Sequence, residues 1–123
     1  MLLALVVAWQ VRPWIRVAWV SAERLEAWMR EEVPMVVADI RSAEEYRAAH
    51  IGPAVSVPQV RIPQMSRVWR PEQRIVLVCR SSYREIQTYH QLRRRGFNNV
   101  YCLSGGMVGW ARYRMRAAER RAL

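Results

Sequence analysis

The stretch from Ile75 to Arg84 constrains the fold of this chain more than any other segment. Four apolar residues, 75–78, precede a cysteine, and a short polar loop that holds two arginines follows at once. Positions 84–95 carry apolar residues at helical spacing and are followed by Gly96, a common helix stop. We therefore expect a buried strand, a tight loop and a helix, with Cys79 at the carboxyl end of the strand.

Strand-like and helix-like segments alternate along the rest of the chain. We expect strands at residues 17–20, 35–40, 54–57, 75–78 and 100–103. We expect helices at residues 22–31, 43–50, 84–95 and 107–116, the first two capped by Ser21 and Ser42. Three prolines make residues 58–71 a loop or a broken helix. This alternation predicts an α/β fold with a mostly parallel sheet.

Ligands of such sheets bind outside the carboxyl ends of the strands. Asp39, Arg41 and Cys79 all fall at such ends in the predicted arrangement. Backbone N–H groups and the helix dipole favour an anion at this place. A thiol in these surroundings has a depressed pKa and reacts as the thiolate. The loop after Cys79 therefore predicts a nucleophilic cysteine.

The 123 residues fit one domain, and a hydrophobic content of 52% predicts an ordinary core. We expect an apolar, Trp-rich arm or extra strand at 1–19, a domain at 20–115 and a basic tail at 116–123. Residues 1–60 hold six arginines against seven acidic residues, a net charge of −1. Residues 61–123 hold fourteen against three, a net charge of +11.

This positive half predicts attraction of a small anion or of an acidic protein partner, with a solvated basic face as the alternative. No signature of a nucleic-acid module is present, so we expect no nucleic-acid partner. The apolar run at 1–9 is about half the length that spans a bilayer. We expect a cytoplasmic protein. A membrane-surface anchor within residues 1–20, with Trp9, Trp14 and Trp19 at the interface, remains open.

The chain has two cysteines, Cys79 and Cys102. Two cysteines without paired Cys or His spacing predict neither a zinc site nor a disulfide scaffold. A reducing compartment is the default for such a chain. Cys102 lies in a predicted strand, where we expect it in the core, and a role as a resolving partner of Cys79 is the alternative.

Four segments in order match one family. They are Asp39-Ile40-Arg41 with Glu45-Tyr46, the turn His50 to Ala54, the loop Cys79 to Arg84, and Gly96-Phe97-Asn98-Asn99-Val100 with Leu103-Ser104-Gly105-Gly106 and Gly109-Trp110. From about residue 20 to 113 the chain resembles a single-domain rhodanese-like sulfurtransferase. The resemblance implies a five-stranded parallel sheet with helices on both faces, and no metal or organic cofactor.

The resemblance also implies that Cys79 takes a sulfane sulfur from thiosulfate or a persulfide and passes it to a nucleophilic acceptor. Backbone N–H groups of the loop Arg80, Ser81, Ser82, Tyr83 and Arg84 would hold the persulfide anion. The side chains of Arg80 and Arg84 would attract an anionic donor. Asp39 and Arg41 would brace the pocket.

Loop length separates sulfur chemistry from phosphate chemistry. Cys79 and Arg84 enclose four residues, whereas a cysteine phosphatase loop encloses five around the wider phosphate. Two positions depart from the family pattern: Ser82 stands where glycine is usual, and Glu85 follows Arg84 where serine or threonine is usual. We expect a charged Glu85 to oppose a bound persulfide unless an arginine pairs with it.

The sequence thus favours a sulfurtransferase. A non-catalytic rhodanese-like binding or regulatory module, or a sulfur carrier that acts with an acidic protein, is the main alternative. A small phosphatase or arsenate reductase of related fold is the third.

Overall fold

A five-stranded sheet forms the centre of the computed structural model, which describes residues 17–81 and 83–123. The strands are β1 (Trp19–Val20), β2 (Val36–Asp39), β3 (Val55–Ser56), β4 (Ile75–Val78) and β5 (Val100–Leu103). Their spatial order is β1-β5-β4-β2-β3, and every neighbouring pair is parallel. The predicted parallel α/β sheet is confirmed, and β4, which leads to Cys79, occupies its middle.

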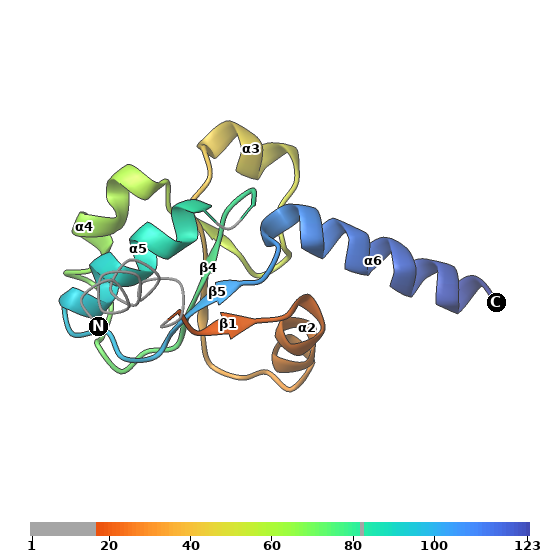
Figure 1. The fold of residues 1–123 in the computed structure, drawn as a ribbon, viewed down its shortest axis with the longest axis horizontal. Helices are drawn as coiled ribbons and strands as arrows, with labels where there is room; N and C mark the ends of the chain where they lie inside the picture. The colour runs from red at the N-terminus through yellow and green to blue at the C-terminus, as the bar shows by residue number, and fades with distance from the viewer. Residues whose placement is uncertain (1–16, 82) are drawn as a thin grey trace, which may run out of the picture.

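Helices cover both faces of the sheet (Figure 1). They are α2 (Ala22–Arg30), α3 (Ala43–Ala48), the 3-10 turn η1 (Gln59–Arg61), α4 (Ile62–Met65), α5 (Tyr83–Arg94) and α6 (Gly106–Ala122). Alternate residues of β4 point to opposite faces. Ile75 and Leu77 pack in the core that α5 covers, and Val76 and Val78 pack in the core that α2 and α6 cover.

The two predicted serine caps are present. The Ser21 hydroxyl accepts a hydrogen bond from the Arg24 N–H at 3.0 Å, and the Ser42 hydroxyl accepts one from the Glu45 N–H at 3.2 Å. These bonds satisfy N–H groups that have no partner inside a first helical turn. They fix where the helices begin after β1 and β2.

The last helix differs from its prediction, because α6 continues to Ala122 instead of ending near residue 116. Residues 117–122 contain alanine, glutamate and arginine without glycine or proline, so nothing in the sequence interrupts the helix. The expected basic tail at 116–123 is thus largely helical, and α6 extends away from the sheet (Figure 1).

Two other segments were left undefined by the sequence. Residues 58–71 fold partly, as η1 and α4. Of the expected N-terminal arm, residues 1–16 lie outside the described residues.

Within the described part of the chain, no helix combines the length and the apolar character needed to cross a bilayer.

The start of α6 holds the loop that follows β4. The Met107 N–H donates to the Cys79 carbonyl at 2.9 Å, and Gly106 has a φ of 55°. A Cβ atom on Gly106 would lie 2.6 Å from the Cys79 carbonyl oxygen and 2.7 Å from the Arg80 carbonyl oxygen. Both are backbone atoms that cannot rotate away, so only glycine fits.

We predict that Gly106→Ala lowers the free energy of unfolding by about 3 kcal/mol, from backbone strain and steric overlap together. Urea denaturation measures this loss. Gly96→Ala has a positive φ of 95° but open space around the new methyl group, so it should cost only about 1 kcal/mol. Gly52→Ala has neither problem and should change stability by less than about 0.5 kcal/mol. Equal losses at Gly106 and Gly96 would contradict the overlap argument.

Candidate active site

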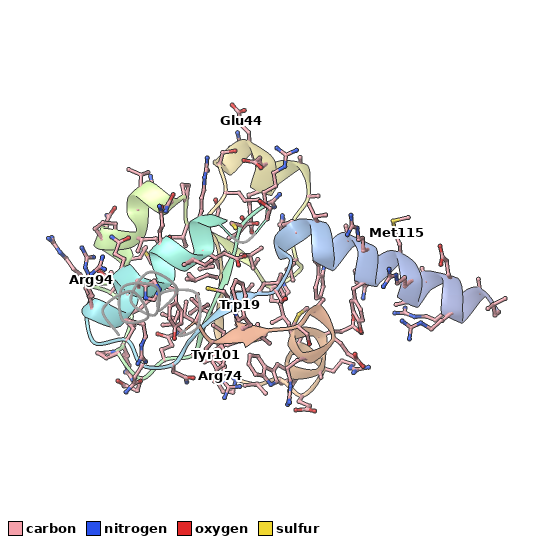
Figure 2. All side chains as sticks on the ribbon, in the orientation of Figure 1. Trp19, Glu44, Arg74, Arg94, Tyr101 and Met115 are labelled. Atoms are coloured by element: carbon pink, nitrogen blue, oxygen red, sulfur yellow. The ribbon has the colours of Figure 1, made fainter. Side chains whose placement is uncertain are left out.

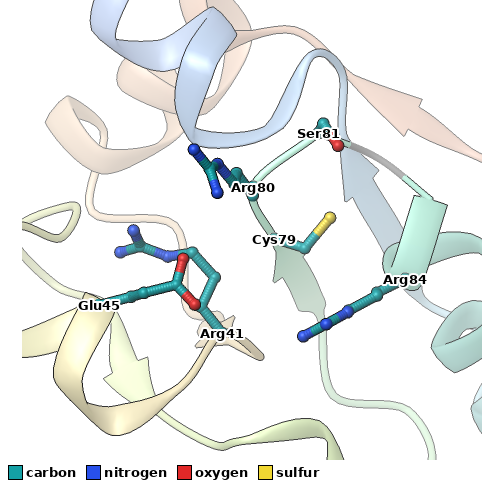
Figure 3. Close-up of a pocket in the computed structure, with 6 residues that line it drawn as sticks. All are labelled: Arg41, Glu45, Cys79, Arg80, Ser81 and Arg84. Carbon is teal, nitrogen blue, oxygen red and sulfur yellow. The ribbon is translucent and has the colours of Figure 1, made fainter.

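Cys79 lies at the wall of a cavity of about 300 Å³ at the carboxyl ends of β2 and β4. The lining residues are Arg41, Glu45, Cys79, Arg80, Ser81 and Arg84. Figure 3 shows Cys79 between two groups, with Arg41 and Glu45 on one side and Arg84 on the other. Cys79 is 3% exposed, so only a small part of the residue faces the cavity. The cavity therefore suits a small ligand that brings one reactive atom to the sulfur.

Arg41, which lines this cavity, forms a buried two-pronged ion pair with Asp39. The Arg41 Nε donates to Asp39 Oδ1 at 3.0 Å, and its Nη2 donates to Oδ2 at 2.8 Å. The same Nη2 also donates to the Ala49 carbonyl at 2.6 Å. The hydrogen bond to Asp39 raises the pKa of Arg41, against the opposing effect of burial. The pair ties the end of β2 to the end of α3.

The arginines of the loop remain at the surface. Arg80, Ser81 and Arg84 are exposed and face the cavity, and Arg84 belongs to the first turn of α5. Ser82 lies outside the described residues, and so does the side chain of Tyr83. Because the charge of Arg41 is matched by Asp39, the positive charge offered to a ligand comes from Arg80 and Arg84. Glu45 is the acidic member of the lining.

Glu85 corrects an expectation from the sequence. Its side chain is wholly buried and turns back to the strand end, where Oε1 accepts a hydrogen bond from the Cys79 N–H at 2.8 Å. Burial raises the pKa of Glu85 to about 8, although hydrogen bonds from the Cys79 N–H and thiol oppose this rise. At neutral pH the carboxyl group is therefore mostly protonated. Removal from water, not an arginine, suppresses its charge: the described residues form no ion pair with it.

Cys102 is a core residue, as expected. It is wholly buried, its thiol donates to the Glu85 carbonyl at 3.5 Å, and burial raises its pKa far above the ordinary value. Cys102 pairs with Leu77, two residues before Cys79, so strand geometry separates the two cysteine Cα atoms by about 8 Å. A disulfide needs them within about 7 Å. The sheet register therefore argues against the alternative role of Cys102 as a resolving thiol.

The fold brings together around one cavity five of the residues singled out from the sequence, namely Arg41, Cys79, Arg80, Ser81 and Arg84. Asp39 is paired with Arg41. The sequence did not single out Glu45 as a lining residue, or the contact between Glu85 and Cys79. Both glutamates lie in the first turn of a helix that follows a strand ending at the site. A glutamate in the first turn of a helix that follows such a strand is the sequence pattern that could have predicted both residues. No group of metal-binding side chains occurs among the residues described.

Comparison with known proteins indicates the same family as the sequence motifs. The rhodanese-like domain family matches residues 21–113. A protein of Allochromatium vinosum named sulfurtransferase is 31% identical over 96 residues, which cover 76% of this chain and 88% of the relative. The thiosulfate sulfurtransferase GlpE of Pseudoalteromonas translucida is 30% identical over 89 residues, covering 72% and 83% of the two chains.

Solved structures show the same fold. A rhodanese-like domain protein from Staphylococcus aureus superposes with a TM-score of 0.71 at 22% identity, covering 76% of this chain and 91% of that one. The human single-domain sulfurtransferase superposes with a TM-score of 0.68 at 19% identity, covering 78% and 96%.

We predict that the buried carboxyl group of Glu85 makes stability depend on pH. A folded-state pKa of about 8 against an ordinary 4.5 means that the folded state binds the extra proton, so stability is full below about pH 4.5 and falls as pH rises through 8. Compared with Glu85→Gln, the free energy of unfolding of the wild type should fall by on the order of a few kcal/mol across this pH range. Urea denaturation of both proteins at several pH values measures the difference.

The matched control is Glu119→Gln, at an exposed position of α6. Its stability relative to the wild type should stay constant over the same pH range. If the difference in free energy of unfolding between the wild type and Glu85→Gln is the same at every pH, Glu85 takes up no extra proton on folding.

Proposed function

The chain belongs to the rhodanese-like domain family, and we propose that it is a sulfurtransferase that works through a persulfide on Cys79. The sulfane sulfur would come from thiosulfate or another persulfide donor and would go to a thiophilic acceptor. The observation that carries the proposal is the placement of Cys79 in a small cavity beside Arg80 and Arg84. Relatives named sulfurtransferase support the same class of reaction.

The first half-reaction forms the persulfide. The Cys79 thiolate attacks the outer sulfur of thiosulfate, the sulfur–sulfur bond of the donor breaks, and sulfite leaves with the electron pair. The positive charge of Arg80 and Arg84 attracts the dianionic donor and stabilises the departing sulfite. With a persulfide donor the leaving group is a thiolate, and the bond changes are the same.

The second half-reaction regenerates the thiol. A thiophilic acceptor attacks the outer sulfur of the Cys79 persulfide, and the electron pair of the broken bond returns to the cysteine sulfur. The acceptor leaves with the sulfur atom. Between the two half-reactions the persulfide anion lies at the N-terminus of α5, where the helix dipole favours negative charge.

The size of the site fits this chemistry. A cavity of about 300 Å³ is at the small end of ligand pockets. The four-residue spacing between Cys79 and Arg84 leaves less room than the loop of a cysteine phosphatase. Both features favour a sulfur compound over a phosphate ester.

A sulfur carrier or regulatory module that works with an acidic protein is the second candidate, and α6 is the feature that favours it. The helix extends beyond the sheet with Met115 on its exposed surface (Figure 2). Its exposed basic residues are Arg112, Arg114, Arg116, Arg120 and Arg121. Such a surface complements an acidic acceptor protein.

We predict that incubation with thiosulfate adds one sulfur atom to the protein, because the Cys79 thiolate is the attacking group. Intact-mass spectrometry under non-reducing conditions measures the gain. Cys79→Ser should abolish it. Cys102→Ser is the matched control and should retain it, because a serine hydroxyl keeps the hydrogen bond to the Glu85 carbonyl. Failure of the wild type to gain sulfur from thiosulfate, a small persulfide or mercaptopyruvate would contradict the proposed function.

The same experiment separates the two candidates. An enzyme that acts alone passes the sulfur on to small thiophiles such as cyanide or dithiothreitol and turns over. A carrier keeps the persulfide in their presence and releases it only to its protein partner. Hydrolysis of an aryl phosphate that depends on Cys79 would instead favour phosphatase chemistry.

A further inference from the structure

We infer that Glu45 makes the cavity selective for a sulfur donor that carries an ammonium group, as the persulfide of an amino-acid thiol does. The ammonium group of such a donor faces Glu45, and its carboxylate faces Arg84. The inference rests on the proposed function and deepens it, because it names the class of donor that this cavity prefers over thiosulfate.

Glu45 reaches the cavity from an element other than the cysteine loop. It lies in the first turn of α3, whereas Cys79 directly follows β4 and Arg84 lies in the first turn of α5. Figure 3 shows Cys79 between the side of the cavity that holds Glu45 and the side that holds Arg84. Because the cavity has a volume of only about 300 Å³, a molecule that fills it contacts both sides and the cysteine at once.

The negative charge of Glu45 is not neutralised by an ion pair. In the described part of the chain, carboxylates pair with arginines at Asp39–Arg41 and at Glu26–Arg114. Arg41 lies on the same side of the cavity as Glu45 (Figure 3), but its guanidinium group is bonded to both oxygens of Asp39. The charges of Asp39, Arg41 and Glu45 sum to −1, so one negative charge is left on this side of the cavity.

The Glu45 carboxylate is held in place by a neutral group. The Ser42 hydroxyl donates to Glu45 Oε1 at 3.2 Å, and the same hydroxyl accepts from the Glu45 N–H at 3.2 Å. This is a serine–glutamate contact of the kind that caps a helix. A hydroxyl group fixes the carboxylate without cancelling its charge. The same contact also allows a purely structural role for Glu45, and the experiment below separates the two roles.

The cavity therefore offers a ligand charges of opposite sign on two sides. Thiosulfate is a dianion, so Arg84 attracts it while Glu45 repels it. The persulfide of an amino-acid thiol carries one positive and one negative group and matches both sides. Selectivity between the two donors arises from an attraction that one gains and a repulsion that the other suffers.

The transfer from such a donor is balanced. The Cys79 thiolate bonds to the outer sulfur of the protonated donor persulfide, the sulfur–sulfur bond of the donor breaks, and the amino-acid thiolate leaves with the electron pair. The proton of the outer sulfur stays with the transferred atom, and the leaving thiolate takes a proton from water. No oxidant or reductant is required.

The test measures single-turnover persulfide formation on Cys79 by intact-mass spectrometry with three donors. They are cysteine persulfide, the persulfide of 3-mercaptopropionate, which lacks only the ammonium group, and thiosulfate. The ratio of the first two rate constants is compared between the wild type and Glu45→Gln, because the two leaving thiolates differ in basicity and only the change in the ratio reports on Glu45.

Glu45→Gln keeps an oxygen for the Ser42 hydroxyl and loses the charge. We expect the ratio of cysteine persulfide to 3-mercaptopropionate persulfide to fall about fivefold, and the rate with thiosulfate to rise about threefold. The matched control is Glu44→Gln, which removes the same charge from the same helical turn. Glu44 is exposed and points away from the cavity (Figure 2), so the ratio should stay as in the wild type.

Circular dichroism checks that each variant folds. Glu45→Ala, which removes the charge together with the contact to Ser42, gives a second reading with the same expected fall in the ratio. An unchanged ratio in Glu45→Gln, or an equal change in rate for all three donors, would overturn the inference and leave the sulfurtransferase proposal intact. If the wild type gains sulfur from none of the donors, the proposed function fails and this inference fails with it.

Discussion

The backbone of Cys79 is held from two sides by two helix starts, and the rest of the site depends on this arrangement. Its N–H donates to Glu85 in the first turn of α5, and its carbonyl accepts from Met107 in the first turn of α6. The sheet register pairs β4 with β2 as far as Val78 and with β5 only as far as Leu77. Beyond that point the helices supply the partners that a strand ladder would have supplied. This is why the chain can leave the sheet there without orphaned backbone groups.

The site contains two wholly buried carboxyl groups, and their charges are compensated in different ways. Asp39 is matched by the guanidinium group of Arg41, which also reaches the carbonyl of Ala49 and so connects β2 with α3. Glu85 has no cation, and burial raises its pKa instead. The first arrangement fixes a charge and braces the wall. The second keeps a mostly protonated carboxyl group against the backbone of Cys79. Truncation of Arg41 would leave Asp39 as an unpaired buried charge, which is among the costlier changes a core can suffer.

Much of the fold follows from the sequence, because short apolar runs between turn residues mark buried strands. The ranges 75–78 and 100–103 match β4 and β5, and Ser21 and Ser42 cap helices as their positions indicate. The position of Cys79 at the carboxyl end of a strand also follows from the residues, and the resemblance adds the family. The burial of Glu85 did not follow, because a first-turn glutamate is usually solvated and its orientation depends on how α5 packs against β4. The same holds for Glu45, which reaches the cavity only because α3 begins beside the end of β2. Tertiary packing, not local propensity, decides both.

A carboxyl group in place of a small hydroxyl makes the site sensitive to pH. A hydroxyl group can accept a hydrogen bond from the Cys79 N–H, but it does not gain or lose a proton near neutral pH. A carboxyl group in water is ionised there and would repel an anionic donor. Burial moves its pKa to about 8, so the group is mostly uncharged at neutral pH. The same shift makes the folded state weaker as pH rises. The stability lost in alkaline conditions and the absence of a negative charge beside Cys79 at neutral pH thus have one physical origin, the removal of a single carboxyl group from water.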